Sequence, residues 1–202
     1  MGSATSADHR YLPDTVQRSV KILVLGSFGV GKTTLIGSVS EIPPLHTEEV
    51  MSDAGADVDD LTGISRKTRT TVALDFGRIT LNRRIALYLY GAPGQQRFWD
   101  LWEGLAEGAL GVLVLVDTRR LEDAFDVLDQ LERLERLPFV VAVNHFPDSL
   151  AHPVEELREA LDLPPHVPVV DCVAPDRHTS LTALTTLTDH AMRVLAARKA
   201  PS

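Results

Sequence analysis

Residues 26–33 read Gly-Ser-Phe-Gly-Val-Gly-Lys-Thr, and they directly follow an apolar run at residues 20–25. A buried strand that enters a glycine-rich turn and then a helix wraps backbone NH groups around a polyphosphate. In such a turn Lys32 supplies a positive charge to the outer phosphates, and Thr33 places a hydroxyl on Mg²⁺. The stretch therefore predicts a phosphate-binding loop made of Gly26, Ser27, Phe28, Gly29, Val30, Gly31, Lys32, Thr33 and Thr34.

Further apolar runs recur at residues 71–76, 84–90, 110–116, 138–143 and 167–173, mostly separated by segments with helical periodicity. Strands that alternate with helices are typical of an α/β domain. Residues 112–116 read Val-Leu-Val-Leu-Val without polar alternation, as expected of a strand covered on both faces in a parallel sheet. We therefore predict an α/β fold of the P-loop NTPase type, with a mostly parallel central sheet and helices on both faces.

The composition limits the classes of function. The chain has 202 residues, 44% of them apolar, and a net charge of −8 that argues against binding to nucleic acid or to anionic membranes. The single cysteine, Cys172, excludes an internal disulfide and a cysteine-based zinc cluster, and its apolar surroundings indicate a core residue in a reducing compartment. The longest apolar stretch, residues 109–116, is too short to span a bilayer. We expect a cytoplasmic protein without direct membrane insertion.

Residues 42–70 interrupt the alternation of strands and helices. Pro43 and Pro44 end the first helix, and no second helix of clear periodicity follows. The first half of the segment is acidic and the second half carries Arg66, Lys67 and Arg69. Long irregular connections in compact domains are often functional, so we predict a long mobile connection that is either a nucleotide-sensing switch or a solvated acidic loop.

A second glycine-containing turn follows the run at 84–90. Residues 91–98 read Gly-Ala-Pro-Gly-Gln-Gln-Arg-Phe, a turn that enters a helix. There Gly94 can bring its NH to a γ-phosphate, and Gln95 is placed to orient an attacking water. Thr71, at the start of the run at 71–76, can close its hydroxyl or carbonyl over Mg²⁺, although threonine also starts strands through its β-propensity alone.

These motifs together resemble the small GTP-binding proteins of bacterial conservons, relatives of the gliding-polarity GTPase MglA and more distantly of Ras. The resemblance is strongest in the phosphate loop and at residues 67–76, 90–98, 117–119 and 141–144. It implies a Ras-like P-loop domain that binds GTP or GDP with Mg²⁺, hydrolyses GTP slowly and alternates between two conformations.

The resemblance also implies a domain boundary and partners. It covers residues 18–198, with residues 1–17 predicted as a disordered N-terminal tail and residues 199–202 as a C-terminal tail. The family partners are a roadblock-type regulator, a candidate GTPase activator, and a membrane histidine-kinase-like sensor. Such a sensor would recruit the protein to the membrane.

The chain departs from the Ras-like pattern at the metal site. Ras-like proteins have Asp-x-x-Gly after the third strand, whereas Gly91 stands at that aspartate position here. The MglA-like group also lacks this aspartate. Loss of an outer-shell metal partner weakens a site by about 10- to 100-fold, so the sequence predicts weak Mg²⁺ binding and slow intrinsic hydrolysis.

The guanine-recognition motif is altered as well. The usual Asn-Lys-x-Asp corresponds to residues 144–148, in which Asn144 matches, His145 replaces the lysine and Pro147 occupies the aspartate position. Asp148 comes one residue late, and it either reaches the guanine NH groups or belongs to a plain Pro-Asp turn. By the same resemblance, Ala174 offers its backbone NH to the guanine O6.

Two questions about catalysis stay open at the level of sequence. Arg69 is a candidate catalytic arginine in cis, one residue out of register with the MglA-like pattern, where Thr70 stands. The missing aspartate and altered base motif also allow an adaptor that binds nucleotide without hydrolysis. A further alternative is an ATPase in which Asp117, at the end of the run at 110–116, is the metal-side carboxylate.

Overall fold

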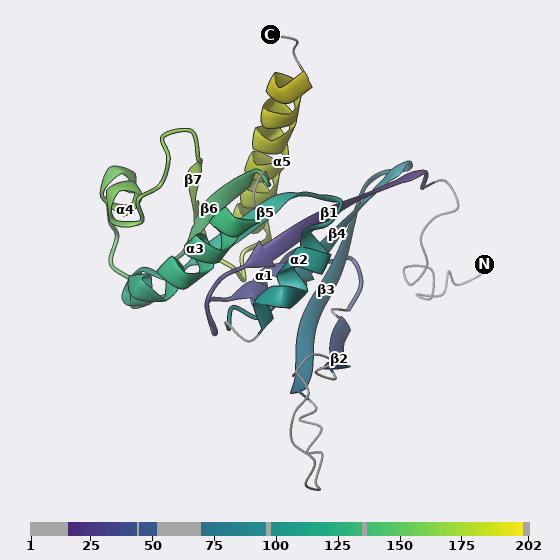
Figure 1. Ribbon diagram of the computed structural model, residues 1–202, viewed down its shortest axis with the longest axis horizontal. Coiled ribbons are helices and arrows are strands. Elements are labelled where there is room, and N and C mark those ends of the chain that lie inside the picture. The colour runs from purple at the N-terminus through teal and green to yellow at the C-terminus, as the bar shows by residue number, and fades with distance from the viewer. Residues whose placement is uncertain (1–15, 44, 52–69, 96–97, 135–136, 200–202) are drawn as a thin grey trace, which may run out of the picture.

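The computed structural model describes residues 16–43, 45–51, 70–95, 98–134 and 137–199. Seven strands form one sheet in the order β2-β3-β4-β1-β5-β6-β7 (Figure 1). Their bounds are β1 Arg18–Leu25, β2 Leu45–Met51, β3 Thr70–Asn82, β4 Ile85–Gly91, β5 Ala109–Val116, β6 Phe139–Asn144 and β7 Val169–Cys172.

Helices cover both faces of this sheet. Their bounds are α1 Lys32–Val39, α2 Trp99–Ala106, the 3₁₀ helix η2 Thr118–Ala124, α3 Phe125–Arg133, α4 Val154–Ala160 and α5 Arg177–Lys199. Side chains of β1 alternate between two cores, because Ile22 packs with α1 and α5, whereas Leu23 packs with α2 and α3. The predicted strand covered on both faces, β5, is buried from Gly111 to Val116.

The strand pairing confirms the predicted fold class. β1 pairs in parallel with β4 and β5, and β6 continues the parallel arrangement to β7, whereas β3 is antiparallel to β2 and β4. When the edge strand β2 is set aside, the sheet order is β3-β4-β1-β5-β6-β7. If these six strands are renumbered along the chain, this is the Ras-like order 2-3-1-4-5-6. The carboxyl ends of the parallel strands therefore meet at one edge of the sheet, where ligands bind in such folds.

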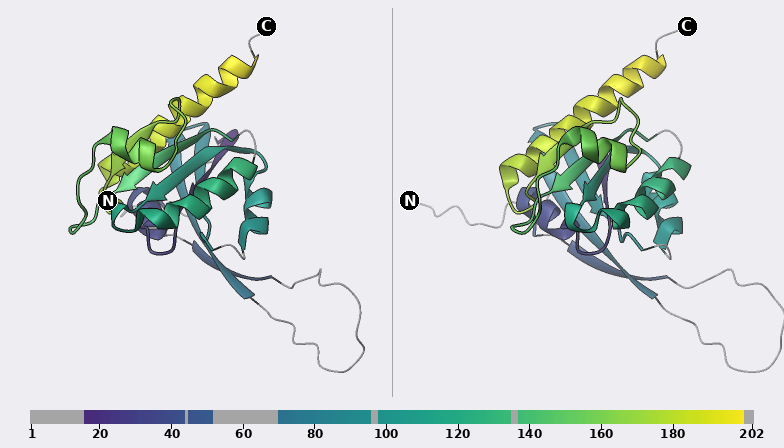
Figure 2. Two further views of the ribbon diagram at one scale, coloured as in Figure 1. Left: turned by 60° about the vertical axis from the view of Figure 1, so that its left-hand side comes forward. Right: turned by 90° about the vertical axis from the view of Figure 1, so that its left-hand side faces the viewer.

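The structure corrects the prediction for the segment after the first helix. Residues 45–51, predicted as irregular, form β2, which pairs with β3 from Leu45 opposite Phe76 to Met51 opposite Thr70. The acidic residues of β2 interrupt the apolar pattern by which strands are recognised in a sequence. An edge strand tolerates such residues, because it pairs with another strand on one side only. β3 also continues past residue 76 to Asn82. Figure 2 shows β2 and β3 extending beyond the body of the domain.

Two further expectations concern Cys172 and membrane-spanning helices. Cys172 is a free, buried thiol at the end of β7, and burial raises its pKa. Among the helices that the structure describes, none combines the length and the apolar character needed to cross a membrane.

Candidate nucleotide-binding site

The phosphate loop joins the buried end of β1 to the first turn of α1. Gly31 precedes the helix with φ of 105°, in the left-handed region that favours glycine. A Cβ at this position would lie 2.6 Å from Asn144 Nδ2. The loop therefore packs directly on the end of β6. The unpaired backbone NH groups at the start of α1 give this end of the helix a positive potential that favours an anion.

Lys32 lies across the phosphate loop. Its Nζ donates hydrogen bonds to the carbonyl oxygens of Gly26 and Ser27, both at 2.8 Å. Burial lowers the pKa of Lys32 to about 8, and the nearby Asp75 carboxylate partly offsets this effect. The ammonium is therefore mostly charged at neutral pH, and the Asp75 carboxylate balances only part of this charge. A bound polyphosphate would supply the missing negative charge.

The structure adds a carboxylate that the sequence motifs did not reveal. Thr33 Oγ1 donates to Asp75 Oδ2 at 2.5 Å, and Asp75 is 9% exposed on β3, directly opposite Gly91. A Cβ at Gly91 would lie 3.2 Å from Asp75 Oδ2, so the glycine makes room for the carboxylate. An acidic group from the neighbouring strand therefore lies beside residue 91, which itself carries none. Weak Mg²⁺ binding stays a prediction, with Asp75 as a further carboxylate to consider at this position.

Thr33 and Asp75 fit a Mg²⁺ ion. Their hydroxyl and carboxylate oxygens are hard ligands of the kind that Mg²⁺ prefers, and the ion completes its shell with phosphate oxygens and water. The sequence signal for Asp75 was an acidic residue inside the otherwise apolar run at 72–76. The side chain of Thr71, the other predicted metal ligand, lies outside the described part of the structure, and so does Arg69.

The turn after β4 lies against the phosphate loop. A Cβ at Gly94 would overlap the carbonyl oxygen of Gly26 and come within 3.1 Å of Ser27 Cα. The buried Trp102 of α2 anchors this turn, because its Nε1 donates to the Pro93 carbonyl at 3.0 Å. Gln95 follows with an exposed side chain. The predicted γ-phosphate residues therefore adjoin the loop that would hold the phosphates.

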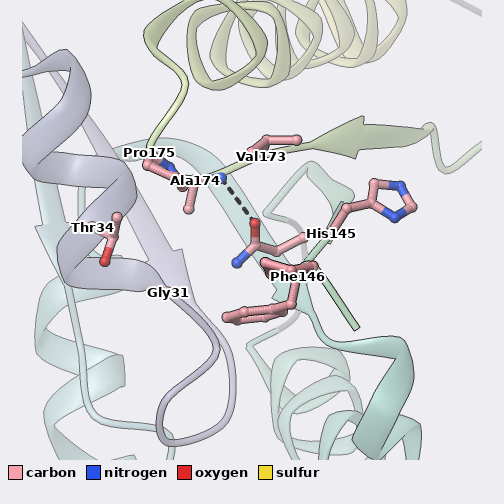
Figure 3. A pocket seen from close by; sticks show the side chains of 9 residues that line it. Gly31, Thr34, His145, Phe146, Val173, Ala174 and Pro175 are labelled. Atoms are coloured by element: carbon pink, nitrogen blue, oxygen red, sulfur yellow. Dashed lines mark hydrogen bonds between the residues drawn. The ribbon is translucent and has the colours of Figure 1, made fainter. Parts of the chain in front are cut away.

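Asn144 connects the phosphate loop to the loop after β7. It is 2% exposed; its Nδ2 donates to Val30 O at 2.8 Å, and its Oδ1 accepts from the backbone NH of Ala174 at 2.8 Å (Figure 3). Both ends of the amide are engaged with other elements of the protein. The NH of Ala174, predicted to bind guanine O6, is donated to Asn144 in this structure.

A pocket of about 500 Å³ opens beside Asn144, which is within the usual range for small-molecule sites. In Figure 3 the ring of Phe146 points toward the phosphate loop, whereas His145 points away. His145 Nε2 lies 2.7 Å from Asp171 Oδ1. The lining residues are Gly31, Thr34, Asn144, His145, Phe146, Pro147, Val173, Ala174 and Pro175.

Asp148 belongs to an ion-pair network centred on Arg119. Arg119 Nη1 contacts Asp148 Oδ1 at 2.7 Å, and Arg119 Nη2 contacts the buried Asp117 at 2.8 Å. The hydrogen bonds from Arg119 hold the pKa of Asp117 below its usual value. The Asp148 side chain is 70% exposed and is not among the described residues that line the pocket. The carboxylate of Asp117 accepts a hydrogen bond from Arg119, whereas the carboxylate that is bonded to Thr33 is that of Asp75.

The sequence is similar to several known proteins. It is 27% identical over 130 residues to the uncharacterized protein MJ1339 of Methanocaldococcus jannaschii, covering 62% of this chain and 69% of that protein. It is 28% identical over 130 residues to mouse Ras-related protein Rab-32, covering 62% of this chain and 47% of that protein. Over 160 residues it is 25% identical to mouse ADP-ribosylation factor-like protein 15, covering 76% and 68% of the two chains.

A family model described as "conserved hypothetical ATP binding protein" matches residues 24–194. The match begins within β1 and ends within α5, so it includes the phosphate loop, Asp75 and the pocket beside Asn144. Together with the fold, it makes this chain a P-loop nucleotide-binding protein, and the chain belongs to the family of conserved hypothetical ATP binding proteins.

Proposed function

We propose that the protein is a molecular switch that binds GTP and GDP with Mg²⁺ and hydrolyses GTP slowly. The contact between Gly94 and the phosphate loop carries this proposal. A third phosphate held beside Lys32 must be accommodated at this contact, whereas a diphosphate need not reach it. The turn at residues 92–95 would therefore adopt different positions in the two nucleotide states, which is the basis of a switch.

Each residue has a distinct role in the proposed hydrolysis. Gln95 orients a water molecule, which attacks the γ-phosphorus while the bond to the β–γ bridging oxygen breaks, giving GDP and phosphate. Lys32 stabilises negative charge on the transferred group, and Mg²⁺ held by Thr33 and Asp75 would contribute to the same effect. A partner or Arg69 would supply the positive charge that accelerates such reactions.

The biological setting is proposed from resemblance. Similarity to a Ras-related protein and to an ADP-ribosylation factor-like protein supports a small-GTPase role. We place the chain in the conservon branch related to MglA, acting in a cytoplasmic signalling module. Its proposed partners are a roadblock-type regulator and a membrane histidine-kinase-like sensor.

A second candidate function is ATP binding, as the description of the family says. The structure favours this candidate at one point, because Asp148 is paired with Arg119 and does not line the base pocket. An adaptor that binds nucleotide without hydrolysis is the third possibility, and it would share the same phosphate loop. Turnover measurements separate the adaptor from the two NTPases.

Replacement of Gln95 by leucine tests the proposed hydrolysis. The Gln95→Leu protein is expected to release phosphate from GTP about 10- to 100-fold more slowly in multiple turnover, because the attacking water loses its positioning group. Nucleotide affinity should be unchanged. Gln17→Leu, at an exposed position before β1, serves as a matched control. Tight nucleotide binding by the parental protein without any turnover would contradict hydrolysis and support the adaptor.

Replacement of Asp75 by asparagine tests the metal site. The Asp75→Asn protein should need about 10- to 100-fold more Mg²⁺ for half-maximal nucleotide binding, because the charged ligand beside Thr33 is lost. Nucleotide affinity in EDTA should not fall below the parental level, which reports that the variant is folded. The exposed Asp129→Asn on α3 is the control. An unaltered Mg²⁺ requirement would remove Asp75 from the metal site.

A further inference from the structure

The groups that would read the edge of a base in this pocket already have partners in the described structure. The amide of Asn144 is bonded to Val30 O and to the NH of Ala174, each at 2.8 Å. His145 points away from the pocket and pairs with Asp171 (Figure 3). The carboxylate of Asp148 is held by Arg119 at 2.7 Å. Each of these groups is therefore already engaged with another part of the protein, and base-edge recognition would have to share or replace that interaction.

Phe146 instead offers an aromatic face to the pocket. Its ring is a lining element, and the guanidinium carbon of Arg119 lies 3.7 Å from the ring centroid. Arg119 itself is not among the described lining residues. Its guanidinium occupies one face of the ring, and a planar ligand that enters beside Gly31 would stack on the other face.

Two carboxylates hold Arg119 in place against the ring of Phe146. Arg119 is bonded through Nε and Nη2 to Asp117, which is 2% exposed at the end of β5, and through Nη1 to Asp148. A guanidinium fixed by two carboxylates has little freedom to leave the ring. The ring is therefore oriented before a ligand arrives, which reduces the entropic cost of stacking.

We propose that the site binds the base of its nucleotide by stacking a purine ring on Phe146. It therefore accepts ATP and GTP with similar affinity and prefers both to pyrimidine nucleotides. The inference rests on the proposed nucleotide-binding function and defines its substrate class. Stacking on an aromatic side chain tolerates different bases, because every base has a π-face. Strong discrimination between two purines instead requires buried polar groups committed to one base edge. Pyrimidine rings overlap Phe146 less and bind more weakly.

Competition binding tests the proposal on the complete chain. ATP, GTP, CTP and inorganic tripolyphosphate are titrated against ribose-labelled fluorescent GDP at constant Mg²⁺. ATP and GTP should compete within about tenfold of each other, with CTP weaker. Phe146→Leu should weaken ATP and GTP alike by about tenfold while leaving tripolyphosphate unchanged, because the phosphate loop is intact. Phe125→Leu, at a partly exposed position on α3, should change nothing.

Two results would overturn the stacking proposal while leaving the proposed function in place. One is a preference for GTP over ATP above about 100-fold that disappears in Asp148→Ala, which would show edge recognition by that carboxylate. The other is a Phe146→Leu protein with parental affinity for both purines. If neither the nucleotides nor tripolyphosphate bind, the proposed function itself is wrong, and the stacking proposal with it.

Discussion

A Lys32→Met protein is expected to bind GTP and GDP roughly 100-fold more weakly than the parental protein, because a charge-assisted contact to the phosphates is lost from a low-dielectric loop. The variant retains the loop glycines and the start of α1, so the remaining affinity comes from backbone NH groups. Equilibrium titration with fluorescent GDP measures the effect. Lys21→Met on β1 is a matched control whose affinity should be parental.

The same substitution should change how the stability of the nucleotide-free protein depends on pH. Burial lowers the pKa of Lys32 from 10.5 to about 8, so the folded state holds this proton less strongly than the unfolded state does. Between pH 8 and 10.5 the unfolded state therefore binds more protons, and the free energy of unfolding of the parental protein rises with pH. Lys32→Met removes this rise, so the free energy of unfolding of the variant minus that of the parental protein should fall across this window. Urea unfolding at several pH values measures it, and a difference that stays constant between pH 8 and 10.5 would contradict the buried-charge argument.

An Asn144→Ala protein is expected to lose about 2–4 kcal/mol of unfolding free energy and most of its nucleotide affinity. The substitution leaves Val30 O and the NH of Ala174, both buried, without the partners that they have in the structure. The phosphate loop then loses its tie to β6 and to the loop after β7. Denaturant unfolding and GDP titration give the two quantities.

Two variants make the Asn144 result specific. Asn144→Asp keeps an acceptor for the NH of Ala174 but sets a carboxylate against Val30 O, so it should be destabilised as well. Asn82→Ala, at the exposed end of β3, removes the acceptor of hydrogen bonds from Arg84 N and Ile85 N and should cost only about 1 kcal/mol. An Asn144→Ala protein as stable as Asn82→Ala would exclude the proposed tie between the loops.

Local patterns were sufficient for most of the fold. Each apolar run named from the sequence became a strand with boundaries within a few residues, except at the end of β3, and the spacing in 26–33 placed the phosphate loop between β1 and α1. These features depend on side chains that are neighbours in the chain, so the sequence displays them directly. Asn144 was recognised differently, through its match to the first residue of the Asn-Lys-x-Asp motif of the resembled family.

The features that sequence analysis missed depend on partners that are distant in the chain. Asp75 lies opposite Gly91 because of the antiparallel register of β3 and β4, and it is bonded to Thr33, 42 positions earlier in the chain. Arg119 pairs with Asp148, 29 positions further along the chain, and no local motif encodes that pairing. β2 was missed because its acidic residues interrupt the apolar pattern, while its pairing with β3 follows only from the assembled sheet.

Calorimetric titration of the intact protein with GTP, GDP and ATP in the presence of Mg²⁺ examines whether the loop at residues 26–33 holds a nucleotide. We predict saturable binding of one nucleotide per chain with micromolar or tighter affinity, competed by inorganic tripolyphosphate and strongly weakened in Lys32→Met. Absence of binding by the parental protein at millimolar nucleotide, or undiminished affinity in Lys32→Met, would contradict nucleotide capture by this loop.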